Sequence, residues 1–180
     1  MIRLATLNDV QYIVSLSKKE SLCLGFIPKS AYEAAITAFK GGKRWSNTCN
    51  DKLFVCVENN DLVGFVMFSY GKYSKVNQIC IQEDARLIDR GRALLSAGIS
   101  HGNLRGIEDF SCGCADDLPS NFFWKQMGWV KVGERQGISH KNTWKETSKR
   151  KVNIYRYMTN SLFVNDFGLI LPKENVELVI

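Results

Sequence analysis

Apolar positions along the chain repeat with two different periods, which predict a mixture of helices and strands. After Thr6, the expected cap of a first helix, residues 7, 10, 13 and 14 are apolar at helical spacing. A second helix is expected after Pro28, with Ser30 as its cap and the pair Gly41–Gly42 at its end. The turn sequence Asn59–Asp61 lies between two apolar runs and predicts a hairpin. The expected strands cover residues 2–5, 53–58, 62–70, 76–82, 107–113, 129–134 and 151–158, and two further helices cover residues 90–101 and 118–127.

These elements follow one another in the order β-α-α-β-β-β-α-β-α-β-β. Helices and strands interspersed in this way predict a single α+β domain in which helices flank a mixed central sheet. A chain of 180 residues is long enough to bury a substantial core in one domain. The sequence contains no repeat, low-complexity segment or flexible linker that would divide it.

The composition is that of a soluble globular protein, with 45% hydrophobic and 23% charged residues. The apolar runs are too short to span a bilayer, and the first residues lack the apolar stretch of a secretory signal, so we expect a cytoplasmic protein without a membrane partner. Its six cysteines are then expected to be reduced thiols. With only two histidines and no second pair of ligands at zinc spacing, no metal is expected.

Charge gathers on residues 81–98, where Arg86, Arg90 and Arg92 surround Asp89 and Gly91 just before a predicted helix. This pattern is compatible with a solvated, charged first turn or with a cradle for a phosphorylated ligand. A helix N-terminus supports the second interpretation because it leaves about four backbone N–H groups unpaired and carries roughly half a positive charge. Glycine in an exposed loop would let a phosphate approach the backbone closely.

A second basic stretch, Lys141–Arg156, carries six basic residues against the single acid Glu146, in a chain of net charge +6. Trp144 and Tyr155 are interleaved with these cations. Such a stretch could bind nucleic acid through phosphate contacts and stacking, or it could be a solvated loop that leads into a strand.

Four motifs in this order resemble those of the GNAT superfamily of acyl-CoA-dependent N-acyltransferases, over residues 2–158. The pyrophosphate loop of that family reads Gln or Arg, two residues, Gly, one residue, then Gly or Ala; here Arg86 and Gly91 take the outer positions and Asp89 replaces the middle glycine. The family's Asn, aromatic pair and Gly-aromatic signature is matched by "NFFWKQMGW", which begins at Asn121. "RLATLNDV" at the start and "LVGFVMF" in the hairpin are also similar. Residues 159–180 are then expected to be a C-terminal extension packed on the same domain.

The resemblance implies a site for acetyl-CoA as acyl donor. The pyrophosphate would be held at Gly91 by Arg86, Arg90 and Arg92, and backbone amides of Cys80 and Ile81 would grip the pantetheine and the thioester carbonyl. Asn121 would meet the pantetheine arm, although it is equally compatible with a helix cap, and Trp124 would also belong to the cofactor site. Asp89 would either point to solvent or pair with a neighbouring arginine, or it would mark a site that binds coenzyme A weakly; we favour the first interpretation.

The acid–base groups of the family are not matched. Trp124 stands where the family usually places a tyrosine that protonates the leaving thiolate, and an indole cannot act as a general acid near neutral pH. The start of the central strand carries lysines instead of the family's frequent carboxylate. Asp117 and Tyr70 are the remaining candidate bases, and an aspartate before a helix is also typical of a cap.

The sequence therefore predicts an N-acyltransferase in which an amine of unspecified identity attacks acyl-CoA directly in a ternary complex. A nucleic-acid base modifier that docks through Lys141–Arg156, similar to the phage Mom-like branch, is an alternative. A non-catalytic acyl-CoA-binding module is another, motivated by Asp89 and Trp124.

Overall fold

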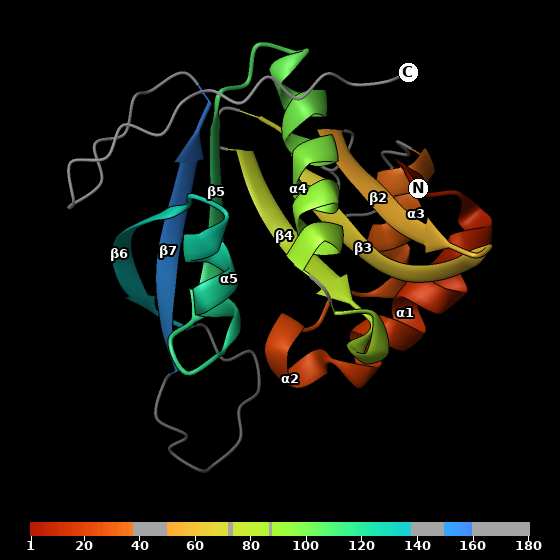
Figure 1. Cartoon of the computed structure of the whole chain (residues 1–180), viewed down its shortest axis with the longest axis horizontal. Coiled ribbons are helices and arrows are strands. Elements are labelled where there is room, and N and C mark those ends of the chain that lie inside the picture. The colour runs from red at the N-terminus through yellow and green to blue at the C-terminus, as the bar shows by residue number, and fades with distance from the viewer. Residues whose placement is uncertain (38–49, 72–73, 87, 138–149, 160–180) are drawn as a thin grey trace.

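The computed structural model describes residues 1–37, 50–71, 74–86, 88–137 and 150–159, which form one seven-stranded sheet with the order β1-β2-β3-β4-β5-β7-β6 (Figure 1). Neighbouring strands are antiparallel except β4 and β5, which are parallel. The predicted α+β class with a mixed sheet is thus confirmed. The strands are β1 (Ile2–Leu4), β2 (Asp51–Glu58), β3 (Asp61–Ser69), β4 (Ser74–Ile81), β5 (Asp109–Ala115), β6 (Val130–Gln136) and β7 (Lys151–Met158).

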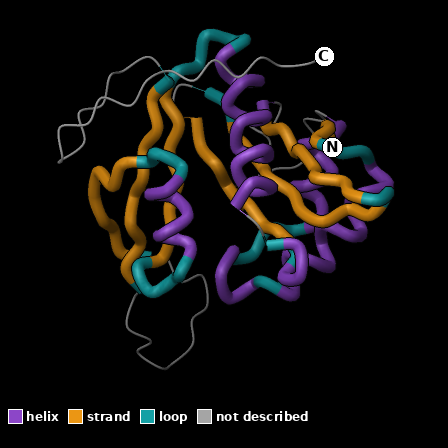
Figure 2. Tube along the Cα trace, in the orientation of Figure 1, coloured by secondary structure: helices purple, strands orange, loops and turns teal. Residues whose placement is uncertain are grey.

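Helices cover both faces of the sheet (Figure 2). Each face has its own apolar core. One face packs against α1 (Val10–Lys19) and α3 (Lys29–Thr37), and the short α2 (Ser21–Leu24) lies between these two helices in the sequence. The other face packs against α4 (Ile88–Asn103) and α5 (Ser120–Gln126). Two 3-10 turns, η1 (Leu7–Asp9) and η3 (Glu83–Ala85), precede α1 and α4.

The observed elements differ from the predicted ones mainly at helix starts. Thr6 is an N-cap as predicted, but it caps the 3-10 turn that leads into α1, and the Asp9 carboxylate accepts the Thr6 backbone N–H at 2.7 Å. Helix α3 begins at Lys29, so Ser30 lies inside the helix and is not its cap. The four-residue α2 was not predicted, because one turn is too short to show a helical period. The hairpin turn is confirmed, with Asn59 and Asn60 at φ 48° and 68°.

The central strands β4 and β5 separate soon after they begin. They pair only at Ser74–Val76 of β4 and 110–112 of β5. Just beyond, the register between β3 and β4 shifts so that Phe68 faces Val76 and Met67 faces Gln78, which leaves Asn77 as an extra, bulged residue. A bulge bends its strand and increases the local twist. The bulge at Asn77 therefore directs β4 away from β5.

Several sequence-based expectations fall on residues outside the described ranges. These are the end of the second helix at Gly41–Gly42, most of the basic stretch (141–149) and the C-terminal extension (160–180). Within the described part of the chain, no helix has the length and apolar content to cross a membrane. The described cysteines are all free thiols.

Candidate active site

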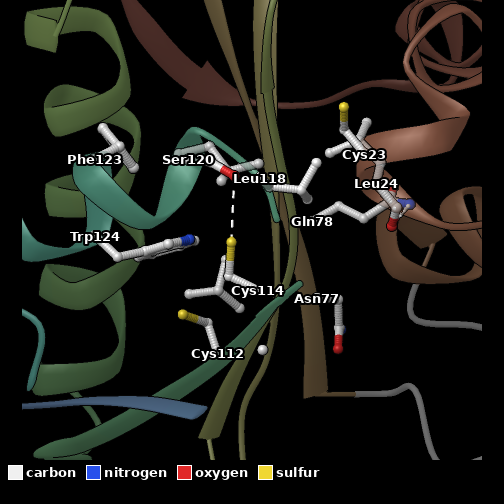
Figure 3. A pocket seen from close by; sticks show the side chains of 13 residues that line it. Cys23, Leu24, Asn77, Gln78, Cys112, Cys114, Leu118, Ser120, Phe123 and Trp124 are labelled. Carbon is white, nitrogen blue, oxygen red and sulfur yellow. Dashed lines mark hydrogen bonds between the residues drawn. The ribbon is translucent and has the colours of Figure 1, made fainter. Parts of the chain in front are cut away.

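A pocket occupies the opening between the separating strands β4 and β5 (Figure 3). Its wall on β4 includes the bulge, its wall on β5 carries two buried thiols, and α5 and α2 close its sides. The lining residues are Val76, Asn77, Gln78 and Ile79 of β4, Cys112, Gly113 and Cys114 of β5, Leu118, Ser120, Phe123 and Trp124 at α5, and Cys23 and Leu24 of α2.

The register of β4 decides which backbone amides face this opening. Gln82 donates its N–H to Val63 of β3 at 2.8 Å, and bonded positions alternate along an antiparallel pair, so Cys80 also belongs to the β3 ladder. The groups of Ile81 point the other way, and its carbonyl accepts Arg86 Nε at 3.3 Å. The Ile81 N–H therefore lies outside the β3 ladder, and its contact with the thioester remains a prediction. The Cys80 N–H is used by β3, so it is not free for the predicted contact, and its side chain lies in the core beneath α1, where burial raises the pKa of the thiol to about 12.

The three arginines before and within α4 differ in their availability. Arg90 forms a two-pronged ion pair with Glu58 and donates to the Ala85 carbonyl at 3.0 Å. In the described structure the Arg90 guanidinium ties α4 to the β2–β3 hairpin, so it would have to leave Glu58 to take its predicted pyrophosphate role. Arg86 is half exposed and pairs with Glu20 at 2.8 Å, while the side chain of Arg92 is 61% exposed.

Asp89 lies in the first turn of α4 with its side chain 82% exposed and its carboxylate 3.9 Å from Arg92. This is the favoured arrangement of the sequence analysis, in which the acid points to solvent beside an arginine. Among the described residues, the Asp89 carboxylate contacts Arg92 and not the backbone N–H groups at the start of α4. The helix start can therefore still present N–H groups and Arg92 to an anion.

Gly91 is buried, whereas the sequence suggested an exposed loop. A Cβ atom on Gly91 would lie 2.7 Å from Cε2 of Phe123, so the glycine lets α4 approach α5. Phe123 in turn lines the pocket. Gly91 thus positions the pocket wall through helix packing in addition to any contact with a ligand.

Asn121 is fully occupied in holding the β5–α5 turn. Its Nδ2 donates to the carbonyls of Ala115, Asp116 and Leu118, at 2.7, 3.2 and 2.8 Å. Its Oδ1 accepts from Asn153 and Tyr155 of β7, at 2.9 and 3.0 Å. The predicted contact of Asn121 with pantetheine is therefore wrong, and it is not the N-cap either, because α5 already begins at Ser120.

Trp124 lies on the pocket wall, with most of its ring in the core against Trp129, at 4.9 Å between ring centroids. Figure 3 shows its indole nitrogen directed toward Cys114. The Cys114 Sγ lies 3.3 Å from Ser120 Oγ. The sequence analysis gave no site role to Cys112, Cys114 or Ser120, because alternating residues of a short strand do not show which face becomes a pocket.

The two predicted bases have other roles. Tyr70 is 5% exposed and donates its hydroxyl to the Gly98 carbonyl at 2.6 Å, and burial holds its pKa far above the usual range. The prediction of Tyr70 as a base is wrong, because this hydroxyl lies in the core under α4. Asp117 is exposed and accepts two bonds from Arg150, at 2.7 and 2.8 Å, which lower the pKa of the carboxyl and weaken it as a base.

Polar residues of β4 that the sequence analysis did not single out organise the side of the pocket that α2 forms. Gln78 accepts the Tyr32 hydroxyl at 2.6 Å and donates to the carbonyls of Leu24 and Gly25, which ties α2 to β4. Arg150 donates to Leu22 at 2.8 Å and ties the same helix to the far half of the sheet. Polar residues inside the apolar strand "VNQICIQ" were the signal that could have revealed Gln78.

Asn77 is held in the bulge by a second polar chain. Its Nδ2 donates to Ser69 Oγ at 2.5 Å, and Ser69 is hydrogen-bonded to the buried carboxyl of Asp51. Burial raises the pKa of Asp51. This chain fixes the orientation of the Asn77 amide at the pocket wall.

The described end of the basic stretch is paired with acids. Arg150 pairs with Asp117, Lys151 lies 3.8 Å from Glu134, and Arg156 pairs with Asp109. The ring of Tyr155 is fully buried in the core. Its predicted stacking on a nucleic acid is therefore wrong for this residue, whereas Trp144 and the cations of 141–149 lie outside the described residues. Among the residues that the structure describes, no three His, Cys, Asp or Glu side chains group as a metal site.

No protein-family model and no curated protein sequence matches the chain. Solved structures do match over 88% of it. A ribosomal-protein-alanine N-acetyltransferase from Brucella melitensis superposes with a TM-score of 0.68 at 14% identity, over 99% of its length. A GNAT-family acetyltransferase from Streptococcus pneumoniae gives 0.66 at 14% over 98%, and a spermidine N-acetyltransferase chimera from Vibrio cholerae and hSSAT gives 0.64 at 13% over 96%. The chain therefore has the fold of the GNAT N-acetyltransferases, as its motifs predicted.

Proposed function

We propose that the protein is an N-acetyltransferase that moves an acetyl group from acetyl-CoA to an amine by direct attack in a ternary complex. The observation that carries this proposal is the separation of β4 from β5 at the Asn77 bulge, which opens a pocket whose wall residue Phe123 packs against Gly91 in the first turn of α4. An extended thioester could enter between the strands while its diphosphate meets the helix start.

The described residues could provide part of the contacts that acetyl-CoA would need. Backbone N–H groups in the first turn of α4, together with Arg86 and Arg92, would hold the diphosphate. The N–H of Ile81 faces away from the β3 ladder and is available to the acyl end. Arg90 is committed to Glu58, so the electrostatic part of binding would rest on the two other arginines.

The chemistry that the donor supplies is an activated acyl carbonyl. The amine nitrogen attacks that carbon, and a strand amide aimed at the carbonyl oxygen stabilises the negative charge that develops there. The amine would approach from the side of α2, whose position is fixed by Gln78 and Arg150. These two anchors would hold nucleophile and thioester in an attacking geometry.

The similar structures suggest which amines to test first, because their names specify an N-terminal alanine of a ribosomal protein and spermidine. We expect acetyl-CoA to bind and to raise the melting temperature by mass action on the folded state. The decisive experiment combines calorimetry of acetyl-CoA binding with detection of released thiol in the presence of an alanine-terminated peptide, spermidine and other small amines.

Binding together with amine-dependent thiol release would support the proposal. Binding without release by any amine would favour the non-catalytic acyl-CoA-binding module. If the protein neither binds millimolar acetyl-CoA nor releases thiol, both the acetyltransferase and the acyl-CoA-binding module are refuted. A nucleic-acid acceptor would instead require salt-dependent binding of DNA or tRNA and thiol release that depends on it.

A further inference from the structure

The proposed transfer needs a proton for the departing thiolate, and Trp124 cannot supply it, because an indole N–H is a hydrogen-bond donor but not an acid near neutral pH. The pocket wall beside Trp124 holds another protic group. Cys114 of β5 is 5% exposed and lines the pocket, and its Sγ lies 3.3 Å from Ser120 Oγ and 3.6 Å from the Ala115 carbonyl (Figure 3).

We propose that Cys114 protonates the departing thiolate and that Ser120 positions and stabilises the Cys114 sulfur. This inference rests on the proposed acetyl transfer. In that step the amine nitrogen bonds to the acyl carbon, the carbon–sulfur bond breaks, and its electron pair stays on the departing sulfur. That sulfur takes the Cys114 proton. Solvent then reprotonates Cys114, and the proton lost by the amine goes to solvent, so one amide and one free thiol are formed.

The surroundings of Cys114 suit this role. Burial raises the pKa of the Cys114 thiol, so the group carries its proton at neutral pH and is a poor nucleophile. Hydrogen bonds from Ser120 and Trp124 act in the opposite direction, since they stabilise the thiolate and lower the pKa. Donor and acceptor are both thiols with ordinary pKa values near about 8.5, so the proton moves between groups of similar basicity.

Cys112 provides a matched control within the same pocket. It lies two residues earlier on the same strand, is equally buried and also lines the pocket. Burial raises the pKa of the Cys112 thiol. Among the described groups, Lys75 lowers this pKa, whereas Ser120 and Trp124 do not act on it as they do on Cys114. Replacing either cysteine removes one buried thiol, but only the Cys114 substitution removes the sulfur that Ser120 contacts.

The first test measures contact with the departing sulfur without turnover. Calorimetry compares coenzyme A with desulfo-coenzyme A, which lacks the sulfur atom, for the wild type, Cys114→Ala and Cys112→Ala. We expect the wild type and Cys112→Ala to prefer coenzyme A by about threefold, as for a weak hydrogen bond, and Cys114→Ala to lose that preference. An equal preference in all three proteins would overturn the assignment of Cys114.

The second test measures thiol release with the best amine of the panel. Cys114→Ala should slow release from acetyl-CoA by about a hundredfold, the lower end of general acid catalysis, whereas Cys112→Ala, which also alters the pocket wall, should have an effect at least about tenfold smaller. Cys114→Ser keeps the size of the side chain but offers a weaker acid, so it should also be slow, by at least about tenfold. With the acetyl thioester of 4-nitrothiophenol, whose thiol needs no acid, the three variants should differ little from the wild type.

Equal losses for Cys112→Ala and Cys114→Ala, or a loss for Cys114→Ala that persists with the aryl thioester, would overturn the proton-donor role while leaving acetyl transfer intact. A wild-type protein that neither binds acetyl-CoA nor releases thiol would overturn both proposals together. The melting temperature of each variant identifies losses that are due to unfolding.

Discussion

Gly91 of α4 and Phe123 of α5 are in direct packing contact, and a Cβ atom on Gly91 would lie 2.7 Å from the Phe123 ring. Alanine at this helical position would gain up to about 1 kcal/mol in helix propensity. It would also overpack the contact, at a cost of about 1–3 kcal/mol. The balance depends on how far the Phe123 ring can move.

We expect Gly91→Ala to destabilise the wild-type protein by about 1 kcal/mol, because overpacking exceeds the gain in propensity. In a Phe123→Leu background, the shorter side chain leaves room and the same change should be neutral or stabilising. Urea unfolding of the four proteins of this double-mutant cycle measures the coupling between the two sites. Equal effects of Gly91→Ala in both backgrounds would show that the contact does not matter.

The arginines of the α4 N-terminus should separate into two classes. Arg86→Ala and Arg92→Ala should each weaken acetyl-CoA binding about tenfold, since a hydrogen bond to a charged group contributes about 1.5 kcal/mol. Arg90→Ala should change that affinity by no more than about twofold, because its guanidinium is bound to Glu58. Calorimetry gives all three affinities, and the strongest loss in Arg90→Ala would mean that the Glu58 pair opens to admit the ligand.

Asp117 should act through α2 and not as a base. Its carboxylate holds Arg150, which donates to Leu22 of that helix. Asp117→Asn should therefore raise the KM of the amine and leave kcat and its pH dependence unchanged, and Arg150→Met should have the same effect. A fall in kcat of about a hundredfold or more for Asp117→Asn alone would restore the base assignment.

The stability of the fold should respond to pH through Asp51. Burial raises the pKa of this carboxyl in the folded protein, so folding favours its protonated form. The stability that it contributes is fully present below the unfolded pKa of about 3.9 and is lost as the pH rises through the folded pKa. In Asp51→Asn the side chain is neutral at every pH, so the variant does not lose this stability as the pH rises. The variant should be more stable than the wild type in urea at pH 7, with the difference disappearing near pH 3.

Asp9→Asn is a control, because Asp9 should make the stability depend on pH in the direction opposite to Asp51. The hydrogen bonds from Arg3 lower the pKa of the Asp9 carboxyl to about 2, so its contribution is present above the unfolded pKa and is lost as the pH falls toward about 2. The substitution should cost about 2 kcal/mol at pH 7 and progressively less in acid. An Asp51→Asn variant that is destabilised in parallel with Asp9→Asn would contradict the burial argument.

The sequence by itself determined the elements and the family pattern. Apolar periods and the Asn59–Asp61 turn are local signals, and so is the glycine that follows the central strand. They predicted the α+β sheet, the hairpin and a helix start that could bind an anion. Local signals work there because the residues that specify each element are neighbours along the chain.

Only the tertiary structure decided which side chains are available. Arg90 meets Glu58, Asn121 meets Asn153 and Tyr155, and Tyr70 meets the Gly98 carbonyl, and each of these pairs joins residues 28 to 34 positions apart. The same holds for the pocket, where a one-residue bulge at Asn77 separates two strands and brings Cys114 and Ser120 beside Trp124. Hydrogen bonding between distant segments and the register of a sheet are properties of packing, so the spacing of residue types along the chain could not specify them.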